Sequence, residues 1–512
     1  MSYVDNKRIA KNTMFMYVRT FVSMVIALYT SRKILEILGI DDFGILNVVG
    51  GVIAMMTFLN GSMSVATQRF LTFEIGRNSQ EGFRNTFSMA CIIHAILAAI
   101  VLLLGETVGV WFVNSYLNIP AARMMAANVV YQMSMLSCVV GILQTPYNAS
   151  IISYERMHVY AYVGLGESLA KLVIVFLLLV SPTHKLITYS ILLFGVQLAS
   201  CIIYRVYCHH YFTGCRVSLK WDKSIFREMV GFTGWNMFGT IAWLLKDNGA
   251  SILLNIFGGP AVNAARGVAS QVTNASTSLM GGFQSAVNPQ ITKNYAANDR
   301  EHTCLLMCRS SKFSYFLMYI IALPVLLECD FLLDIWLVEV PSFAVLFTQI
   351  VLIEALCNTL GGPMITSLMA TGKIKWYQII VGSILLLNIP VAWLLLQLGY
   401  HIATPLIVSL IVMIIGHMVR IIFCKLQIGL SLRDYCRTVF VPIVTVTVLA
   451  GVIAYGIHYL LSEGLIRLIT TSIVSVLSIT AAIYLFGLDT AEKTTVTLVI
   501  KSKMAKLLFF KS

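Results

Sequence analysis

Charged residues are scarce in this chain of 512 residues. Asp, Glu, Lys and Arg together make up 12% of it, about half of the ~25% that is usual in a soluble domain. Hydrophobic residues make up 58%. So apolar a composition leaves too little charge to cover a water-facing surface, and it predicts an integral membrane protein.

The sequence also lacks the features of a membrane enzyme. Every connecting loop between apolar stretches is short, and there is no carboxylate-rich segment large enough to form a soluble catalytic domain. The glycine pairs at 50–51, 281–282 and 361–362 do not form a phosphate-binding motif. The sequence therefore argues against a polysaccharide polymerase or a glycosyltransferase, and it predicts a transporter that needs no cofactor.

Metal-binding and redox motifs are missing as well. The chain has 11 cysteines but no CxxC pair. The cluster of Cys208, His209, His210 and Cys215 has no zinc-site spacing. Most other cysteines, such as Cys91, lie in apolar stretches where a thiol behaves as a small hydrophobic group. We expect no metal site.

Long apolar segments recur from one end of the chain to the other. About fourteen of them have roughly 20 residues or more, enough at ~1.5 Å per residue to cross ~30 Å of hydrocarbon. The predicted fold class is all-α, a polytopic membrane protein with about fourteen transmembrane helices.

Basic residues are distributed unevenly when the loops are assigned alternately to the two sides of the membrane. Only five of the 36 Lys and Arg residues fall in outer loops, namely Arg32, Lys33, Arg123, Lys185 and Arg467. The positive-inside rule then predicts a bacterial inner membrane protein with both termini in the cytoplasm. The net charge of +13 indicates this topology and attraction to anionic membrane lipids, and we expect no nucleic-acid partner.

A polar, basic stretch near the middle divides the chain into two halves. Residues 39–54 and 258–269 share a Gly-containing turn followed by an Asn and a Gly-Val step, which indicates a weak internal repeat. We predict a first six-helix bundle, a cytoplasmic linker, a second six-helix bundle, an additional helix pair and a basic cytoplasmic tail, at residues 1–210, 211–228, 229–430, 431–488 and 489–512.

Four isolated cations, Arg19, Lys171, Lys246 and Arg266, lie inside otherwise apolar segments. Each charge at bilayer depth costs roughly 2.5–3.5 kcal/mol, so together they predict a water-filled cavity that holds an anion. We assign substrate binding to Arg19, Lys246 and Arg266, because guanidinium groups bind phosphate oxygens bidentately. For Arg19 the alternative is snorkelling to the nearby membrane surface.

Acidic residues lie close in sequence to two of these cations, and a third acidic residue, Glu354, stands alone. Glu167 lies four residues before Lys171, a spacing that predicts a structural ion pair. Lys246 and Asp247 are adjacent and so point ~100° apart; we expect Lys246 to face the cavity and Asp247 to turn into its bundle. Glu354 has no cationic neighbour in sequence, so it is either a neutral acid or a cation ligand. We assign cation coupling, to Na⁺ or H⁺, to Asp247 and Glu354.

Several segments carry a family resemblance. Residues 8–32, 38–52 (beginning Leu38-Gly-Ile-Asp-Asp-Phe-Gly), 67–74 and 255–269 resemble the polysaccharide transporter family of bacterial Wzx-type flippases. These flippases belong to the multidrug/oligosaccharidyl-lipid/polysaccharide (MOP) superfamily. The resemblance covers essentially the whole chain.

The resemblance implies a V-shaped pair of helix bundles. It implies that the chain flips an undecaprenyl-pyrophosphate-linked oligosaccharide from the inner to the outer leaflet by alternating access, beside a polysaccharide polymerase and glycosyltransferases. In the related lipid II flippases, arginines of the first and eighth helices contact the pyrophosphate, and Arg19 and Arg266 lie in the corresponding helices. The alternative is a cation-coupled multidrug exporter of the same superfamily, of the MATE type, which favours acidic and aromatic residues in its cavity.

Overall fold

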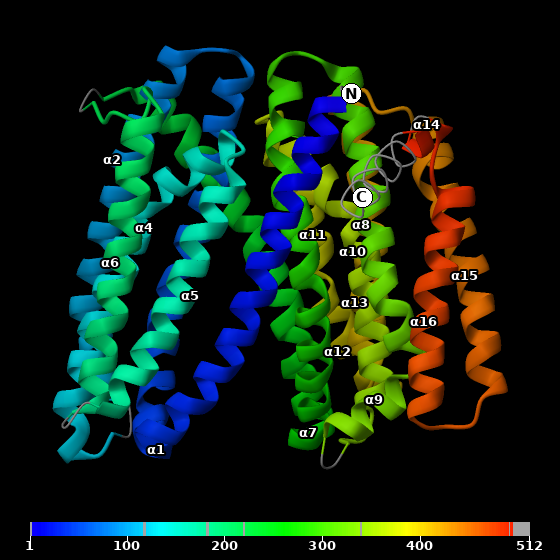
Figure 1. Cartoon of the computed structure of the whole chain (residues 1–512), viewed down its shortest axis with the longest axis horizontal. Helices are drawn as coiled ribbons and strands as arrows, with labels where there is room; N and C mark the ends of the chain where they lie inside the picture. Colours follow the sequence, from blue (N-terminus) through cyan, green and yellow to red (C-terminus); the bar gives the residue numbers. More distant parts are fainter. Residues whose placement is uncertain are drawn as a thin grey trace, which may run out of the picture. The chain divides into compact units, whose positions relative to one another are not determined.

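The computed structural model describes residues 3–115, 119–180, 184–218, 221–337, 340–490 and 492–494. These residues are helical almost throughout, and there is no β-strand among them (Figure 1). The predicted all-α class is confirmed.

The α-helices follow one another with short connections, and three of them are extended by a turn of π-helix. They are α1 (Tyr3–Gly76), α2 (Gln80–Leu104), α3 (Val110–Ser115), α4 (Met124–Ser153), α5 (Met157–Val180), α6 (Lys185–Tyr211), α7 (Lys223–Ala296), α8 (Arg300–Leu327), α9 (Cys329–Trp336), α10 (Ala344–Ala370), α11 (Lys375–Leu386), α12 (Asn388–Gln397), α13 (Thr404–Ile428), α14 (Leu432–Tyr435), α15 (Val441–Leu460) and α16 (Leu465–Ala482). Helix α7 begins earlier than the predicted bundle boundary, because the Asp222 carboxylate caps its first turn by accepting from the backbone N–H groups of Ser224 and Ile225.

Helices α1 and α7 are each two helices joined at a glycine. Each has 74 residues, and each breaks at one residue with positive φ: Gly39 at 79° and Gly259 at 77°. This conformation has little steric cost for glycine and a large one for most other residues. The glycine turns expected from the internal repeat are therefore confirmed in both halves of the chain.

Ten further segments of the described chain are long and apolar enough to cross a membrane. Each half of α1 and of α7 is also long enough for one crossing at ~1.5 Å per residue. Together they give about fourteen membrane-spanning helices, so the chain is a polytopic membrane protein.

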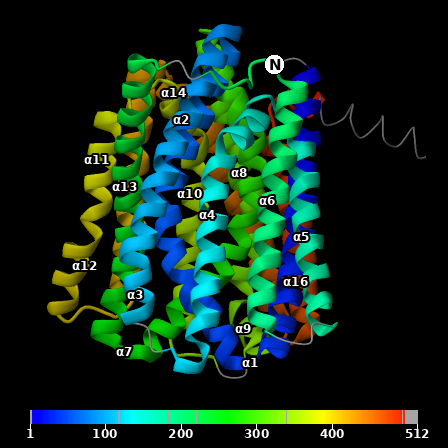
Figure 2. The same cartoon turned by 90° about the vertical axis from the view of Figure 1, so that its left-hand side faces the viewer.

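Contacts divide the chain into two units. The first contains Ile9–Met237 and Thr292–Asn298. In it, α4 packs between α2 and α6, and α5 packs against α6 (Figure 2). Its core includes the buried ring of Tyr131, whose hydroxyl donates to the carbonyl of Gly105, 2.8 Å away, where α2 passes into a π-helical turn.

The second unit contains the described residues up to Arg8, then Phe238–Ile291 and the described residues from Asp299 onward. Helix α10 packs between α8 and α13, and α11 and α12 pack against α13. The core of this unit runs along α8, α10 and α13 and includes Phe316, Leu352 and Val412. These helices position the site described below.

The last two helices, α15 and α16, pack along α8 (Figure 1). Near the middle of α8, the Tyr315 hydroxyl lies 3.0 Å from the Thr447 hydroxyl. At the end of α8, the carboxylate of Glu328 accepts from His458 Nδ1 at 2.8 Å and from Arg467 Nε at 3.0 Å. The helix pair is therefore fixed to this unit by polar contacts as well as by apolar packing.

Glu328 is fully buried among these partners. Burial by itself raises the pKa of its carboxyl, but the hydrogen bonds from His458 and Arg467 outweigh burial and lower the pKa below its ordinary value. A carboxyl with a lowered pKa in the folded state stabilises the fold above its ordinary pKa. That contribution is lost as the pH falls through the lowered pKa.

We predict that Glu328→Gln lowers the melting temperature of the purified protein at neutral pH. Each lost hydrogen bond to the carboxylate is worth about 1.5–3 kcal/mol. The difference from the unsubstituted protein should shrink as the pH falls through the lowered pKa of Glu328, because the carboxyl then becomes protonated. Glu463→Gln is the matched control, because Glu463 is exposed and lies 3.8 Å from Arg467. Equal melting temperatures for all three proteins at neutral pH would contradict a docking role for Glu328.

Candidate functional site

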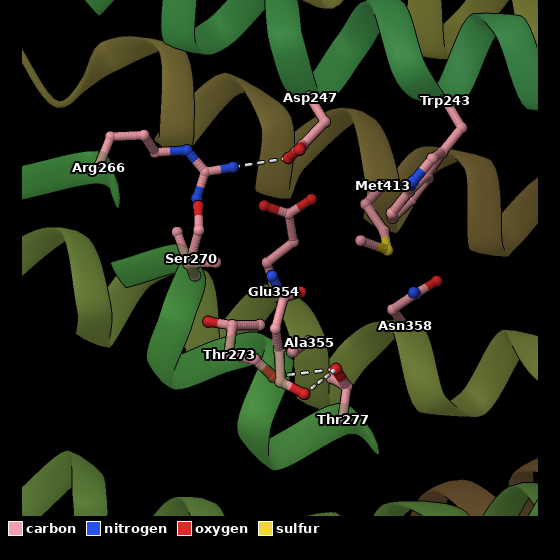
Figure 3. Close-up of a pocket in the computed structure, with 12 residues that line it drawn as sticks. Trp243, Asp247, Arg266, Ser270, Thr273, Thr277, Glu354, Ala355, Asn358 and Met413 are labelled. Atoms are coloured by element: carbon pink, nitrogen blue, oxygen red, sulfur yellow. Dashed lines mark hydrogen bonds and ion pairs between the residues drawn. The ribbon is translucent and has the colours of Figure 1, made fainter. Parts of the chain in front are cut away.

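A polar pocket of about 250 Å³ lies within the second unit, between α7, α10 and α13 (Figure 3). Two carboxylates, one guanidinium, and several hydroxyls and amides line it, together with an indole and a thioether. Its lining residues are Trp243, Asp247, Arg266, Ser270, Thr273, Asn274, Thr277, Val351, Glu354, Ala355, Asn358 and Met413.

The break in α7 brings the first ion pair of the pocket together. Asp247 precedes Gly259 and Arg266 follows it, so the turn places them on facing halves of the helix. Arg266 Nη2 donates to Asp247 Oδ1 at 2.6 Å (Figure 3). Arg266 is 5% exposed, whereas half of the Asp247 side chain is exposed. Asp247 therefore presents a carboxylate to the pocket while it neutralises a buried cation.

The second ion pair joins α7 to α10. The ammonium of Lys246, which is 1% exposed, donates to Glu354 Oε1 and to Ser409 Oγ, the latter at 2.8 Å. The Ser409 hydroxyl donates in turn to Glu354 Oε1 at 3.0 Å, and the Trp243 ring centroid lies 4.6 Å from Lys246 Nζ. A lysine ammonium has three N–H donors and no acceptor. Glu354, Ser409 and the indole face supply partners for all three.

The orientation expected for Lys246 and Asp247 is the reverse of the one observed. Lys246 was expected to face the cavity, but its side chain is buried between helices and does not line the pocket. Asp247 was expected to turn into the bundle, but it lines the pocket and is exposed. The physical reason is the acid at Glu354, which supplies the buried countercharge that Lys246 needs.

The structure identifies the cation that accompanies Glu354. The sequence left this residue as either a neutral acid or a cation ligand, and its cationic partner is Lys246, 108 residues earlier in the chain. Asn388, at the start of α12, also approaches, and its side-chain amide donates to the Lys246 carbonyl at 3.2 Å. The pairing therefore draws α7, α10, α12 and α13 together.

Arg19 lies in the first unit, on α1. Its guanidinium carbon is 4.4 Å from the centroid of the Tyr160 ring, and the side chain passes over Gly164 of α5, where a Cβ atom would overlap it. Its Nε atom is buried and makes no hydrogen bond within the described part of the chain. Arg19 is thus held by an aromatic face and a glycine rather than by a carboxylate.

The predicted ion pair between Glu167 and Lys171 is not formed. Both residues lie on α5 in the described part of the chain, and no salt bridge within 4 Å joins them there. The Lys171 side chain is exposed, whereas Glu167 is partly buried. Sharing one helix face was not sufficient to bring the two charged groups together.

Lys246 and Arg266 both differ from the isolated cations that the sequence suggested. Each is paired with a carboxylate of the same unit. Their burial is therefore compensated by the protein itself, and it does not require a bound phosphate. The reason for expecting an anion at these two residues is removed.

Sequence reasoning missed other buried cations and polar partners. Lys312 is 3% exposed and donates to Glu492 at 2.7 Å, and Arg420 is 4% exposed and donates from Nε to the Tyr377 hydroxyl at 3.3 Å. Both lie within two or three turns of a helix end, so they were counted with the cytoplasmic loops. Ser409, the hydroxyl between Lys246 and Glu354, carries no signal in a segment that is otherwise apolar.

Metal ligands do not cluster in the described residues, which contain no group of three or more His, Cys, Asp or Glu side chains placed to hold a metal. All eleven cysteines are free thiols. The polar chemistry of the pocket is therefore that of ion pairs and hydroxyls.

Comparison with known proteins identifies the fold. A family model described as MatE matches residues 250–394, which include Arg266 and Glu354. A MATE structure in the bent conformation is 11% identical, with a TM-score of 0.73, and an outward-facing multidrug resistance MATE family transporter of the MOP superfamily is 11% identical, with a TM-score of 0.72. Both alignments cover 83% of this chain and 96% of the other. No curated protein matches the chain.

A third similar structure is a MOP superfamily transporter from Pyrococcus furiosus, whose binding pocket is described as having reverse polarity that suggests a different function. It is 11% identical, covers 83% of this chain and 96% of its own, and has a TM-score of 0.70. The chain thus has the fold of MATE transporters.

The assignment to the polysaccharide transporter family was wrong. The family model that matches is MatE, and the similar structures are MATE transporters. Three of the four segments on which the assignment depended lie outside the matched residues 250–394, and the fourth, residues 255–269, lies within them. A flippase of lipid-linked oligosaccharides is not supported.

We predict that Lys246→Met and Glu354→Met each destabilise the protein strongly. The double substitution should restore much of the lost thermal stability. Removing one partner of a buried ion pair leaves an uncompensated charge and costs about 3–5 kcal/mol, but replacing both by apolar groups is often neutral. Thermal unfolding of the four purified proteins in detergent tests the coupling. If the two single losses simply add in the double variant, Lys246 and Glu354 do not depend on each other.

Proposed function

We propose that this chain is a cation-coupled exporter of the multidrug kind, with Asp247 and Glu354 as the carboxylates that couple transport to a cation gradient. The fold shared with MATE transporters and the MatE match over residues 250–394 support a transporter of this kind. The observation that carries the proposal is the pocket of the second unit, in which both carboxylates are held by cations of the protein.

The charges of the two ion pairs cancel. Asp247 and Glu354 contribute two negative charges, and Arg266 and Lys246 contribute two positive charges. An entering cation therefore gains a carboxylate only by competing with Arg266 or Lys246 for it. Because one carboxylate cannot fully satisfy two cations in a poorly solvated site, the binding of the coupling cation and that of a cationic substrate oppose each other. This opposition is the requirement for exchange of one against the other.

The rest of the pocket suits a lipophilic organic cation. The Trp243 indole and the Met413 thioether supply polarizable apolar surface beside the two carboxylates (Figure 3). Cations bind favourably over an indole face, and methionine adapts to substrates of different shape. Hydroxyls and amides such as Thr273 and Asn358 complete a lining in which a few polar groups orient a largely apolar ligand.

The same proposal places the chain in the bacterial inner membrane with both termini in the cytoplasm. The uneven distribution of Lys and Arg among the loops supports this orientation. The partners of the chain are then membrane lipids and small cationic substrates.

The direct test is export of ethidium, a lipophilic cationic dye, from vesicles that contain the protein. We predict that Asp247→Asn reduces export to the level of vesicles without the protein, because the amide keeps the shape of the carboxylate and removes its charge. Lys171→Met is the control, since Lys171 is an exposed side chain of the other unit. Protein levels in the membrane are measured for each variant.

Two outcomes would contradict the proposal. The first is wild-type export of ethidium by a well-expressed Asp247→Asn variant, which would remove Asp247 from the coupling site. The second is a failure of the unsubstituted protein to move ethidium and other lipophilic cations under any imposed cation gradient.

A further inference from the structure

Lys246 occupies the place at Glu354 where a small inorganic cation would bind. From this geometry we infer that Lys246 is a built-in cation that excludes Na⁺ from the coupling site, so that the exporter uses protons and is indifferent to Na⁺. The inference rests on the proposed function, and it goes further by naming the coupling ion and the residue that selects it.

The surroundings of Lys246 Nζ are those of a cation site. Two oxygen atoms, Glu354 Oε1 and Ser409 Oγ, accept from the ammonium, and the negative face of the Trp243 indole lies over it. Carboxylate and hydroxyl oxygens are also the ligands that hard metal cations prefer. An Na⁺ ion at Glu354 would have to share these atoms with the ammonium or displace it.

Charge repulsion opposes the binding of Na⁺ beside the Lys246 ammonium. The burial of Lys246 opposes displacement of the ammonium by Na⁺. A second cation beside Nζ is repelled at short range in a region from which water is largely excluded. A displaced ammonium has no other carboxylate at hand, because the remaining acid of the pocket, Asp247, is already paired with Arg266. Since Lys246 is 1% exposed, it would remain charged and unpaired among apolar side chains, which is strongly unfavourable.

The covalent attachment of Lys246 to the same chain as Glu354 further favours the ammonium over Na⁺ at this site. Lys246 belongs to the same chain as its ligands, so its ammonium competes at a high effective concentration that no bulk Na⁺ gradient changes. The Asn388 amide, which donates to the Lys246 carbonyl at 3.2 Å, holds the backbone of the lysine in register with Glu354.

Loss of a proton neutralises the Lys246 ammonium without displacing the side chain. In this step one N–H bond of the Lys246 ammonium breaks along its hydrogen bond to Glu354 Oε1, the electron pair stays on Nζ, and the Glu354 carboxyl, which lines the pocket, releases the proton there. Glu354 then carries an uncompensated negative charge, which a cationic substrate neutralises. Return of a proton to Nζ restores the ion pair and releases the substrate, so one proton exchanges for one unit of substrate charge. The other charged groups that line the pocket are Asp247 and Arg266, which are paired with each other in this structure.

The experiment uses the purified full-length protein in proteoliposomes, with ethidium as the probe, under either an imposed pH gradient or an imposed Na⁺ gradient. For the unsubstituted protein we expect dye movement that follows the pH gradient and does not change when choline replaces Na⁺. Lys246→Met should lose its response to the pH gradient and gain several-fold stimulation by Na⁺, because the Glu354 site is then open. Lys246→Arg keeps a tethered cation and should remain indifferent to Na⁺.

Na⁺ binding is measured separately by the melting temperature of each protein in NaCl and in choline chloride. We expect a rise in NaCl for Lys246→Met, or for Lys246→Gln if the methionine variant does not fold, and no difference for the unsubstituted protein or Lys246→Arg. Stabilisation of the unsubstituted protein by Na⁺, or dye movement driven by its Na⁺ gradient, would overturn the inference while leaving the proposed function intact. Folded Met and Gln variants without any response to Na⁺ would also overturn it. If the unsubstituted protein moves no dye under either gradient, the proposed function fails, and the melting temperatures still decide whether Lys246 excludes Na⁺.

Discussion

A charge buried in a membrane-spanning bundle has to meet an opposite charge within hydrogen-bond distance, and the second unit is organised around this constraint. Lys246 and Glu354 are 108 residues apart in sequence, yet each would be an uncompensated buried charge without the other. Their pairing fixes the rotation of α7 about its axis relative to α10. With Lys246 turned inward, Asp247 has to point ~100° away from it. In this direction the Asp247 side chain faces the pocket.

The glycine break in α7 supplies the second half of the arrangement. A continuous helix would place Asp247 and Arg266 more than five turns apart, too far for a side-chain contact. The turn at Gly259 folds the helix back, and the two residues meet at 2.6 Å. One conformational property of glycine therefore determines whether Arg266 is a free cation or half of an ion pair. The neutrality of the pocket, and with it the competition between protein cations and entering cations, depends on this turn.

The sequence was sufficient for the membrane class, the approximate number of spans and the glycine turns, because each depends on local composition or on one residue's backbone preference. It was not sufficient for the pairing of charges. Glu354 gave no sequence signal of a partner, and the spacing of Glu167 and Lys171 indicated a pair that the structure does not contain. Lys312 and Arg420 looked like loop residues, yet they are buried. Charge pairing depends on tertiary contacts between distant helices, which hydropathy and periodicity do not encode. The family resemblance depended on four short segments, three of them in the first half of the chain, whereas the match that corrected it covers residues 250–394.

Two of the buried lysines in the second unit have similar chemistry and different access to the pocket. Lys312 is paired with Glu492, and neither residue lines the pocket. This contact attaches the chain beyond α16 to α8. Lys246 is paired with Glu354, and Glu354 does line the pocket. Glu492 also lies 3.2 Å from Arg309 Nε, so its carboxylate is held by two cations of the protein, and a contact away from the pocket in this way serves to stabilise the fold. An ion pair whose acid faces a pocket is an equilibrium between the tethered cation and any cation that enters. Solvent access to one carboxylate thus separates a structural contact from one that can bind and release a substrate.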